Sequence, residues 1–509
     1  MSVAATFQLQ MQFSGSAGAW SNVWGDVRTD SPVRGEYGIR GAGPADRVAA
    51  PGTLTFALDN SERNSAGLAG YYSPGHLSAR SGFELGIGVR MTMTYSGSTI
   101  DKFRGLLDEI VPMAGKRGRR LTVCTAVDWM DEARREKTTR LATQFDQRGN
   151  QLIDTAVGAM TLQPADTDLA VGQEIFPYAF DNSPDESTSV MALFQSIAMS
   201  EMGFIYVKGD GTLTFQDRYA RPTSVSAMSV LNDDMVGMTP RRSRDNIYNH
   251  IRAVVHPRRI DTGACVLFTL RNATLVAAGD TLLLANRYFG RVTASNPTQT
   301  RIGAYSTCNL ILNTDYVFNA ASDGTGADLG ADLTVGASFG ANSALISLAN
   351  GGGMDGYVTH LQIQGRGLYD YEPVVMESLD ATSQAAYGDN VLTYDMPLQI
   401  NPLVGLEAAD YLRGLWKDPQ TMADTLNFIA NASDGLMTAG LLREPGDRVR
   451  ISETVSGINT EHYYIQGVGF EIQPKDLLEF RWLVVPVENF QAWLLEISDK
   501  LGDNTILGY

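Results

Sequence analysis

Three runs near the end of the chain decide the fold class: RVRI at residues 448–451, HYYI at 462–465 and EFRWLVV at 479–485. Their composition and spacing are typical of strands, and Pro486 closes the last of them. The apolar residues that follow at helical spacing are Phe490, Trp493, Leu494 and Ile497. We expect residues 376–509 to form a β-barrel with a terminal helix, whose stripe packs inside the chain or docks a neighbouring protein.

The beginning of the chain has the same character. GTLTFAL at 52–58 and IGVRMTM at 87–93 alternate apolar and polar residues between clusters of Gly, Pro, Asn and Ser. This pattern indicates short antiparallel strands. Residues 1–130 are therefore expected to form a second β-barrel or sandwich.

Between these ends the pattern becomes mixed. Helical spacing relates Val190, Phe194, Ile197, Ala198 and Glu201, and Pro184, Asp185 and Glu186 suit a first helical turn, so a helix is expected over 185–202. The runs 205–208 and 212–215 flank Gly209-Asp210-Gly211, which predicts a hairpin. Residues 131–259 are thus expected to be an α+β domain.

Residues 260–371 are poor in Lys and rich in Gly, Ala, Ser, Thr and Asn, with strand-like runs at 314–318 and 343–347. This composition predicts an inserted β-sandwich over 260–375. After it, one apolar helical face is formed by Ala408, Tyr411, Leu412, Leu415 and Trp416. The whole chain is expected to be mainly β, with two barrels flanking an α+β domain and the inserted sandwich.

Composition limits the function. The 509 residues suffice for several domains, and a net charge of −17 removes the counterion release that drives ordinary nucleic-acid binding. No run is long and apolar enough to span a bilayer, and no secretion signal is present, so we expect a cytoplasmic origin without membrane insertion. The scattered cysteines, expected to be reduced core thiols, are Cys124, Cys265 and Cys308.

Catalytic patterns are weak. Asp128, Asp131 and Glu132 could supply paired carboxylates for glycoside chemistry, but a solvated strand-to-helix junction explains them better. Gly115-Lys116-Arg117 lacks the rest of a phosphate-binding loop. We therefore expect no enzyme, no catalytic residue and no cofactor.

Metal ligation also lacks a pattern. No spacing that suits a metal site relates the five histidines, His76, His250, His256, His360 and His462. The loop 323–332 carries Asp323, Asp328 and Asp332, which could hold Ca²⁺, but turn chemistry explains them better. No metal site is expected.

One basic cluster stands out in this acidic chain: Lys116, Arg117, Arg119 and Arg120. These residues could pair with acidic surface on a neighbouring subunit, or only keep a loop solvated, and we favour solvation. The two readings stay open from the sequence.

Several motifs together resemble the tail-tip or baseplate hub proteins of tailed bacteriophages. The motifs that carry the resemblance are PGTLTFALDN at 51–60 with YYSPGH at 71–76, GFIY at 203–206 with GDGTL at 209–213, Ser383 with Tyr387-Gly388, and EPGDRV at 444–449. Their order covers the chain from about residue 27 to 486. The insert matches the hub pattern least.

The resemblance implies a homotrimer with two tube-like barrels per subunit, which joins a sixfold tail tube to threefold tip components. It implies these partners: a distal tail or tail tube protein, tip, fibre or spike proteins, and the tape-measure protein. An acidic lumen would let DNA pass without specific binding. The expected location is the virion tail tip, after assembly in the host cytoplasm.

Two rival functions remain open. A carbohydrate- or receptor-binding adhesin would stack sugars on exposed aromatic residues of the insert, with the candidates Tyr288, Phe289, Tyr357, Tyr369 and Tyr371. A cell-wall hydrolase would clear peptidoglycan in a zymogram, and we expect no clearing.

Overall fold

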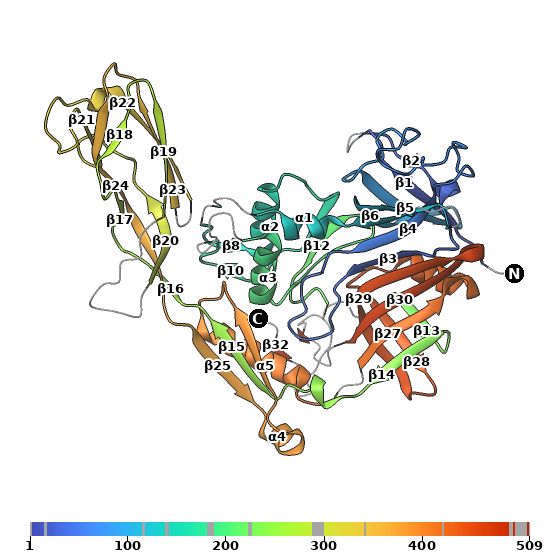
Figure 1. Cartoon of the computed structure of the whole chain (residues 1–509). Coiled ribbons are helices and arrows are strands. Elements are labelled where there is room, and N and C mark those ends of the chain that lie inside the picture. Colours follow the sequence, from blue (N-terminus) through green and yellow to red (C-terminus); the bar gives the residue numbers. More distant parts are fainter. Residues whose placement is uncertain are drawn as a thin grey trace.

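The computed structural model describes residues 3–14, 18–113, 118–137, 141, 143–180, 188–221, 226–287, 300–340, 343–419, 422–487, 492–493 and 506–507. The chain is elongated (Figure 1). Its first and last β units lie side by side at one end, an α+β unit follows, and the insert projects at the other end. The fold is mainly β and multidomain, as the sequence predicts.

The N-terminal unit contains β1 (Thr6–Met11), β2 (Ser21–Asn22), the 3-10 turn η1 (Trp24–Asp26), β3 (Val33–Gly38), β4 (Thr53–Asp59), β5 (Gly88–Tyr95), β6 (Ser98–Pro112) and β7 (Leu121–Val127). The predicted strands at 52–58 and 87–93 are confirmed as β4 and β5. Alternation places Leu54, Phe56 and Leu58 of β4 in the core, because successive side chains of a strand point to opposite faces.

The C-terminal unit contains β13 (Ser229–Asn232), β14 (Gly237–Arg241), β27 (Met422–Ile429), η4 (Ala430–Ala432), α6 (Asp434–Leu442), β28 (Arg448–Glu453), β29 (Ile458–Gln473), η5 (Pro474–Asp476) and β30 (Leu477–Pro486). The strands predicted at 448–451, 462–465 and 479–485 are therefore confirmed as parts of β28, β29 and β30. The segment 229–241, assigned from sequence to the middle domain, reaches this unit on two sides, since β13 pairs with β28 and β14 pairs with β27.

The two β units are joined in one sheet. β29 pairs antiparallel with β3, from Gly467 opposite Gly38 to Ile472 opposite Val33. Among the described residues this gives a 13-stranded sheet with the main order β14-β27-β30-β29-β3-β4-β7-β6-β5-β1-β2. The expected pair of separate closed barrels is not found, because no sheet in the described part closes and strands from both units share one ladder and one core.

The α+β unit contains α1 (Trp129–Arg135), β8 (Gln147–Arg148), α2 (Gly149–Gly158), β9 (Asp166–Leu169), β10 (Ile175–Phe176), α3 (Val190–Glu201), β11 (Phe204–Val207) and β12 (Thr212–Gln216). The predicted hairpin is confirmed, since β11 pairs with β12 and Gly211 has φ +89°. The predicted helix start is wrong. Ser189 caps α3 by accepting a hydrogen bond from the Ala192 N–H, and residues 181–187 lie outside the described part.

A three-stranded sheet lies next to this unit. It has the order β25-β15-β26 and is formed by β15 (His250–Val255), β25 (Val374–Leu379) and β26 (Val391–Met396), with the nearby elements η2 (Arg244–Asn246), α4 (Ala381–Tyr387) and α5 (Pro402–Trp416). The predicted helix with the Ala408 and Leu412 face is α5, and both residues are buried. The boundary expected between residues 375 and 376 falls inside β25.

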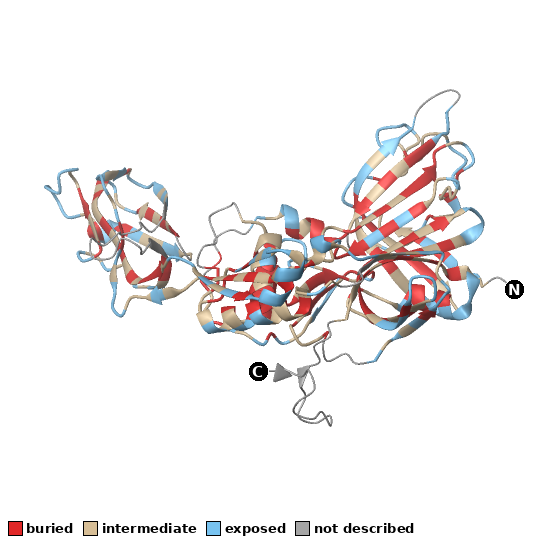
Figure 2. Cartoon of the chain, turned by 90° about the horizontal axis from the view of Figure 1, so that it is seen from below, coloured by how far each residue is buried: buried red, intermediate tan, exposed pale blue. Residues whose placement is uncertain are grey.

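The insert is built from strands: β16 (Arg258–Ile260), β17 (Cys265–Thr269), β18 (Thr274–Val276), β19 (Thr281–Arg287), β20 (Thr300–Thr307), β21 (Tyr316–Asn319), η3 (Gly330–Asp332), β22 (Leu333–Phe339), β23 (Ser343–Asn350) and β24 (Gly356–Asp370). β24 pairs with five of these strands, and β19-β23-β22 forms a second sheet. Both sheets contribute to one apolar core, which includes Phe318, Ile346 and Val358. Figure 2 shows buried residues along the strands of this projecting end of the molecule.

The expected terminal helix is not found at Trp493, the one residue of its apolar stripe that the structure describes. Trp493 belongs to the short strand β31 (Ala492–Trp493), which pairs in parallel with β32 (Ile506–Leu507). Phe490, Leu494 and Ile497 lie outside the described residues.

Candidate functional site

A buried ion pair joins the N-terminal unit, the α+β unit and the C-terminal unit. Lys102 of β6 is fully buried, and its Nζ lies 2.8 Å from Oε1 of Glu444. The ammonium also donates to the carbonyls of Leu441 at 3.2 Å and Arg443 at 3.3 Å. The hydrogen bonds of this cation therefore lead to the end of α6 and to the segment that follows it.

The same carboxylate accepts two further hydrogen bonds. Tyr37 of β3 donates its hydroxyl at 3.0 Å, and the backbone N–H of Gly209 in the β11–β12 turn donates at 3.2 Å. Burial, and then the charge of Glu444, raise the pKa of Tyr37 well above its usual value. The phenol thus stays a neutral donor, and Glu444 connects three parts of the chain.

The loop of Glu444 is held by its own geometry. Gly446 has φ +92°, and a Cβ there would lie 2.5 Å from the Tyr206 hydroxyl. Asp447 accepts from the Glu444 N–H at 3.1 Å, and burial raises its pKa. The EPGDRV motif therefore packs against the GFIY and GDGTL motifs, which the sequence shows only as separate segments.

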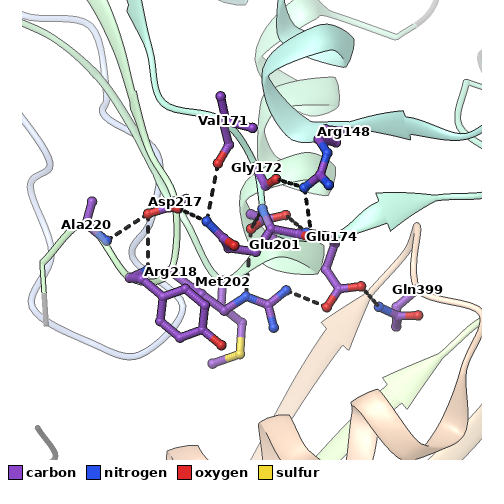
Figure 3. Close-up of polar contacts among 12 residues, drawn as sticks. Arg148, Val171, Gly172, Glu174, Glu201, Met202, Asp217, Arg218, Ala220 and Gln399 are labelled. Atoms are coloured by element: carbon purple, nitrogen blue, oxygen red, sulfur yellow. Dashed lines mark hydrogen bonds and ion pairs between the residues drawn. The ribbon is translucent and has the colours of Figure 1, made fainter. Parts of the chain in front are cut away.

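A second polar junction lies at the end of α3 (Figure 3). Glu201 is fully buried and accepts hydrogen bonds from the backbone N–H groups of Gln173 at 2.8 Å and Glu174 at 3.0 Å. Arg218 lies 3.7 Å from Glu201 and 2.7 Å from Glu174. Burial raises the pKa of Glu201, although Arg218 and the two amides oppose that shift.

The outer contacts of this junction reach the β25-β15-β26 sheet. Gln399, in the segment between β26 and α5, donates to Glu174 at 3.5 Å. On the other side, the Gln173 amide donates to Asp217, and Arg148 donates to the Gly172 carbonyl at 2.5 Å. The network thus fixes the segment 171–174 between α2, α3 and the end of β12 (Figure 3).

A third junction explains the Ser383 and Tyr387-Gly388 motif. The buried Asn249 side chain donates to the Ser383 hydroxyl at 3.1 Å and to the Gly388 carbonyl at 2.8 Å, and accepts from the Asn390 N–H at 2.9 Å. Ser383 in turn donates to the Lys417 carbonyl at 2.6 Å. These hydrogen bonds attach α4 to Asn249, just before β15, and to the end of α5.

The YYSPGH motif lies in a long ordered loop, residues 60–87. Buried Asp26 accepts hydrogen bonds from the Tyr72 hydroxyl at 2.5 Å and from the N–H and hydroxyl of Ser65 at 2.6 Å each. Asn60 accepts from the Tyr72 N–H at 2.8 Å. These contacts attach the loop to the end of the N-terminal sheet, with Tyr72 in the core.

The carboxylates weighed for catalysis have structural positions. Asp128 caps α1 by accepting from the Met130 N–H at 3.0 Å, but it is buried and not solvated as expected; burial raises its pKa to about 7. Asp131 is also buried, and Arg134 and Arg135 pair with it. The structure brings Asp128 and Asp131 together at a helix start, each facing neighbours of its own chain.

The remaining polar candidates are dispersed. In the described residues no group of three or more His, Cys, Asp or Glu could hold a metal ion. Asp323 accepts from the N–H and hydroxyl of Thr325, and Asp328 accepts from the Gly330 N–H, which is the turn chemistry expected of this loop. Cys124 is buried, but Cys308 is exposed, so it is not a core thiol as expected.

The aromatic candidates of the insert do not form one surface. Tyr369 is buried beneath Arg259, whereas Tyr357 lies near the opposite end of β24 and Tyr371 follows that strand. Tyr288 and Phe289 lie outside the described residues. Of the basic cluster, Arg119 and Arg120 are described and exposed, while Lys116 and Arg117 are not described. Among helices in the described part, none is long and apolar enough to cross a bilayer.

Comparisons with known proteins complete the description of the chain. No protein-family model and no curated protein matches it. Solved structures do. Several of these structures are tail proteins. A 43 kDa tail protein of prophage MuSo2 from Shewanella oneidensis has a TM-score of 0.47 at 10% identity, with 94% of this chain and 98% of that chain covered.

Two further neighbours cover the same share of the chain. A tail protein from Neisseria meningitidis MC58 has a TM-score of 0.46 at 9% identity, covering 94% of this chain and 96% of that one. An E. coli component of the type VI secretion system has a TM-score of 0.37 at 9% identity, covering 94% and 77%.

The sequence motifs include the junction residues Glu444, Gly209 and Ser383, whereas Lys102, Arg218 and Asn249 lie outside every motif. Lys102 and Glu201 lie in runs that predict ordinary elements, and nothing in their spacing relates them to Glu444 or Gln173. Glycine was the one available signal, because Gly209, Gly211 and Gly446 fall in the motifs that meet at Glu444.

Proposed function

We propose that this chain is a structural subunit of a phage tail, the central trimeric hub of a tail tip or baseplate. The observation that supports this most is the pairing of β29 with β3, which sets the two β units of one chain side by side in a continuous sheet. A hub with two tube-like units per subunit needs such an arrangement, because three copies then supply six similar units to a ring that meets a sixfold tube.

The three polar junctions support a rigid subunit. Lys102, Glu201 and Asn249 are all fully buried and each joins segments far apart in the sequence. Buried polar groups with all partners in place favour one arrangement over others. The proposed role is therefore to hold shape and transmit load, with no catalysis and no cofactor.

The proposed hub joins the distal tail or tail tube protein to tip, fibre or spike components at the virion tail tip, after assembly in the host cytoplasm. The tape-measure protein and then DNA pass through its lumen, and the net charge of −17 disfavours adhesion of DNA there.

Two measurements test the proposal. Class averages of the purified chain in negative stain should show a threefold ring, and its solution mass should be that of three copies. Antibodies raised against the chain should label the tail ends of particles that contain it. Labelling of capsids, or none on tails, would reject the hub role.

A further inference from the structure

An apolar and basic surface lies at one end of the N-terminal unit. We define the basic end patch as Leu68, Leu77, Met113, Arg119 and Arg120, all exposed. Leu77 is fully exposed, and the loop 60–87 meets the segment before β7 where the Asn60 N–H donates to the Arg120 carbonyl. Large apolar side chains that gather on a surface with charged neighbours are typical of protein contacts.

The patch is ordered by backbone contacts. The Asn60 N–H donates to the Arg120 carbonyl at 2.9 Å, and the Gly70 N–H donates to the Asn60 carbonyl at 3.1 Å. The Asn64 side chain donates to the Leu68 carbonyl at 2.8 Å, and the Met113 N–H donates to the Leu121 carbonyl at 2.7 Å. Because these segments are already fixed, little ordering entropy is lost when a partner binds.

A second surface, on the C-terminal unit, has the opposite charge. We define the acidic corner patch as Val230, Val236, Val455, Asp233, Asp234 and Glu461, all exposed. Val455, at the tip of the β28–β29 hairpin, is 95% exposed. On these strands the nearest basic side chain is that of Arg450, which pairs with Val230 on β13 and with His462 on β29. It is only half-exposed.

This tip is also held in place. Asp233 accepts hydrogen bonds from the Thr454 N–H at 2.8 Å and hydroxyl at 2.6 Å. Glu453 accepts from the N–H groups of Val455 at 3.1 Å and Ser456 at 2.5 Å. The hydrogen bonds from Thr454 lower the pKa of Asp233, and those from Ser456 and Val455 lower that of Glu453, so both carboxylates are charged at neutral pH.

The two patches face opposite ends of the joined sheet. One end of the sheet is marked by Ile472 of β29, which pairs with Val33 of β3. At this same end β4 finishes at Asp59, which pairs with Leu121 of β7. The tip of the β28–β29 hairpin lies at the other end, beyond Gly467. At 3.3 Å per residue, the length of β29 separates this tip from Ile472 by up to roughly 45 Å. The patches of one chain therefore do not meet each other, and contact requires a second copy.

We propose that the basic end patch of one copy binds the acidic corner patch of the next copy. Both patches combine exposed apolar side chains with charges. Arg119 lies 3.8 Å from Asp30 of its own chain, so Arg120 is the main positive charge of the basic end patch, and it is opposite in sign to Asp233, Asp234 and Glu461. A contact between two different patches of identical chains is heterologous, and repeats from copy to copy until a ring closes. The number of copies rests on the proposed hub function, whereas the patch pairing does not.

Charge reversal and charge exchange in the full chain test the pairing. Arg119→Glu with Arg120→Glu should weaken self-association on the order of tenfold, because like charges then face each other. Asp234→Lys with Glu461→Lys should do the same. The four substitutions together should restore association, since complementarity returns with reversed sign.

Matched controls separate this effect from general charge. Arg259→Glu with Arg271→Glu changes two exposed arginines on the insert and should leave association unchanged. Leu77→Ser and Val455→Ser should each weaken association, whereas Leu403→Ser, at a 66% exposed position on α5, should not. Circular dichroism melting checks that each variant is folded before its mass is measured by light scattering.

The outcomes distinguish this inference from the hub proposal. A wild-type ring that survives either reversal, or fails to return in the four-substitution variant, overturns the patch pairing and leaves the hub proposal standing. A wild-type chain that stays monomeric at micromolar concentration also overturns the pairing, while antibody labelling of tail ends decides the hub role separately.

Discussion

Lys102 and Glu444, on strands and loops from opposite ends of the sequence, meet in an ion pair of 2.8 Å in which the lysine is fully buried. A buried ammonium is tolerated only when its hydrogen bonds are satisfied. Here Glu444 and the carbonyls of Leu441 and Arg443 satisfy it. The pair is therefore a condition for packing the C-terminal unit against β6.

Removing one partner of the Lys102–Glu444 pair should lower the free energy of unfolding. Glu444→Gln leaves the buried Lys102 without its counter-charge, and breaking such a pair costs about 3 kcal/mol or more of unfolding free energy. Urea unfolding measures this change. Glu471→Gln, which breaks the exposed pair with Arg34 at 3.0 Å, is the control and should cost less than about 1 kcal/mol. Equal losses in the two variants would contradict the assigned role.

The seam between the two β units can be tested at one glycine. A Cβ on Gly35 of β3 would lie 2.3 Å from the Phe470 ring of β29. Gly35→Ala should therefore destabilise the chain by about 1–3 kcal/mol through overpacking. Gly469→Ala, on the facing strand, meets its nearest atom at 3.5 Å and should be neutral or slightly stabilising.

Thermal and urea unfolding of these two variants provide the measurement. If Gly469→Ala destabilised the chain as much as Gly35→Ala, the close packing of Phe470 on Gly35 would not be the cause.

The buried Asp128 predicts a dependence of stability on pH. Its pKa is raised to about 7 by burial, whereas an unfolded aspartate titrates near pH 4. Between these values the folded chain keeps a proton that the unfolded chain has released, so Asp128 lowers stability as pH rises from about 4 to about 7. Asp128→Asn removes this loss and keeps the cap, because an amide oxygen also accepts the Met130 N–H.

We expect Asp128→Asn to gain stability relative to wild type by a few kcal/mol as pH rises through this window. Urea unfolding at several pH values gives the difference between the two proteins. Asp166→Asn, at an exposed position, is the control and should show no such trend. A parallel pH profile for wild type and Asp128→Asn would exclude the assigned burial effect.

Asn249 should anchor α4. Asn249→Ala removes three hydrogen bonds and leaves the Asn390 N–H and Gly388 carbonyl without this partner, which costs about 2 kcal/mol. Hydrogen exchange should also speed up in 381–390. Asn390→Ala, whose side chain makes one weak exposed contact at 3.4 Å, should change stability by less than about 0.5 kcal/mol.

Local elements were largely predictable, because their signals lie within a few residues. The β11–β12 hairpin follows from Gly209-Asp210-Gly211, and β4 follows from the alternation of GTLTFAL. The sequence pattern predicts the start of α3 too early, because Pro184, Asp185 and Glu186 suit a first helical turn as well as Ser189 does. Ser189 is the residue that caps the helix.

The sites were less predictable. The sequence correctly predicts a strand-to-helix junction at Asp128, but not the burial of Asp128, because Gly52, which lies against its carboxylate, precedes a different strand. The basic cluster gave two readings from sequence. The position of an acidic corner patch on another unit is what favours contact with a second copy.

The sequence by itself determined strands such as β4, β5 and β30, the β11–β12 hairpin and the apolar face of α5, since alternation, glycine turns and helical spacing act over short distances. Only the tertiary structure decided that β29 pairs with β3 and that Lys102 meets Glu444. Those contacts join segments hundreds of residues apart, and burial of their polar groups is favourable only once both sides are present.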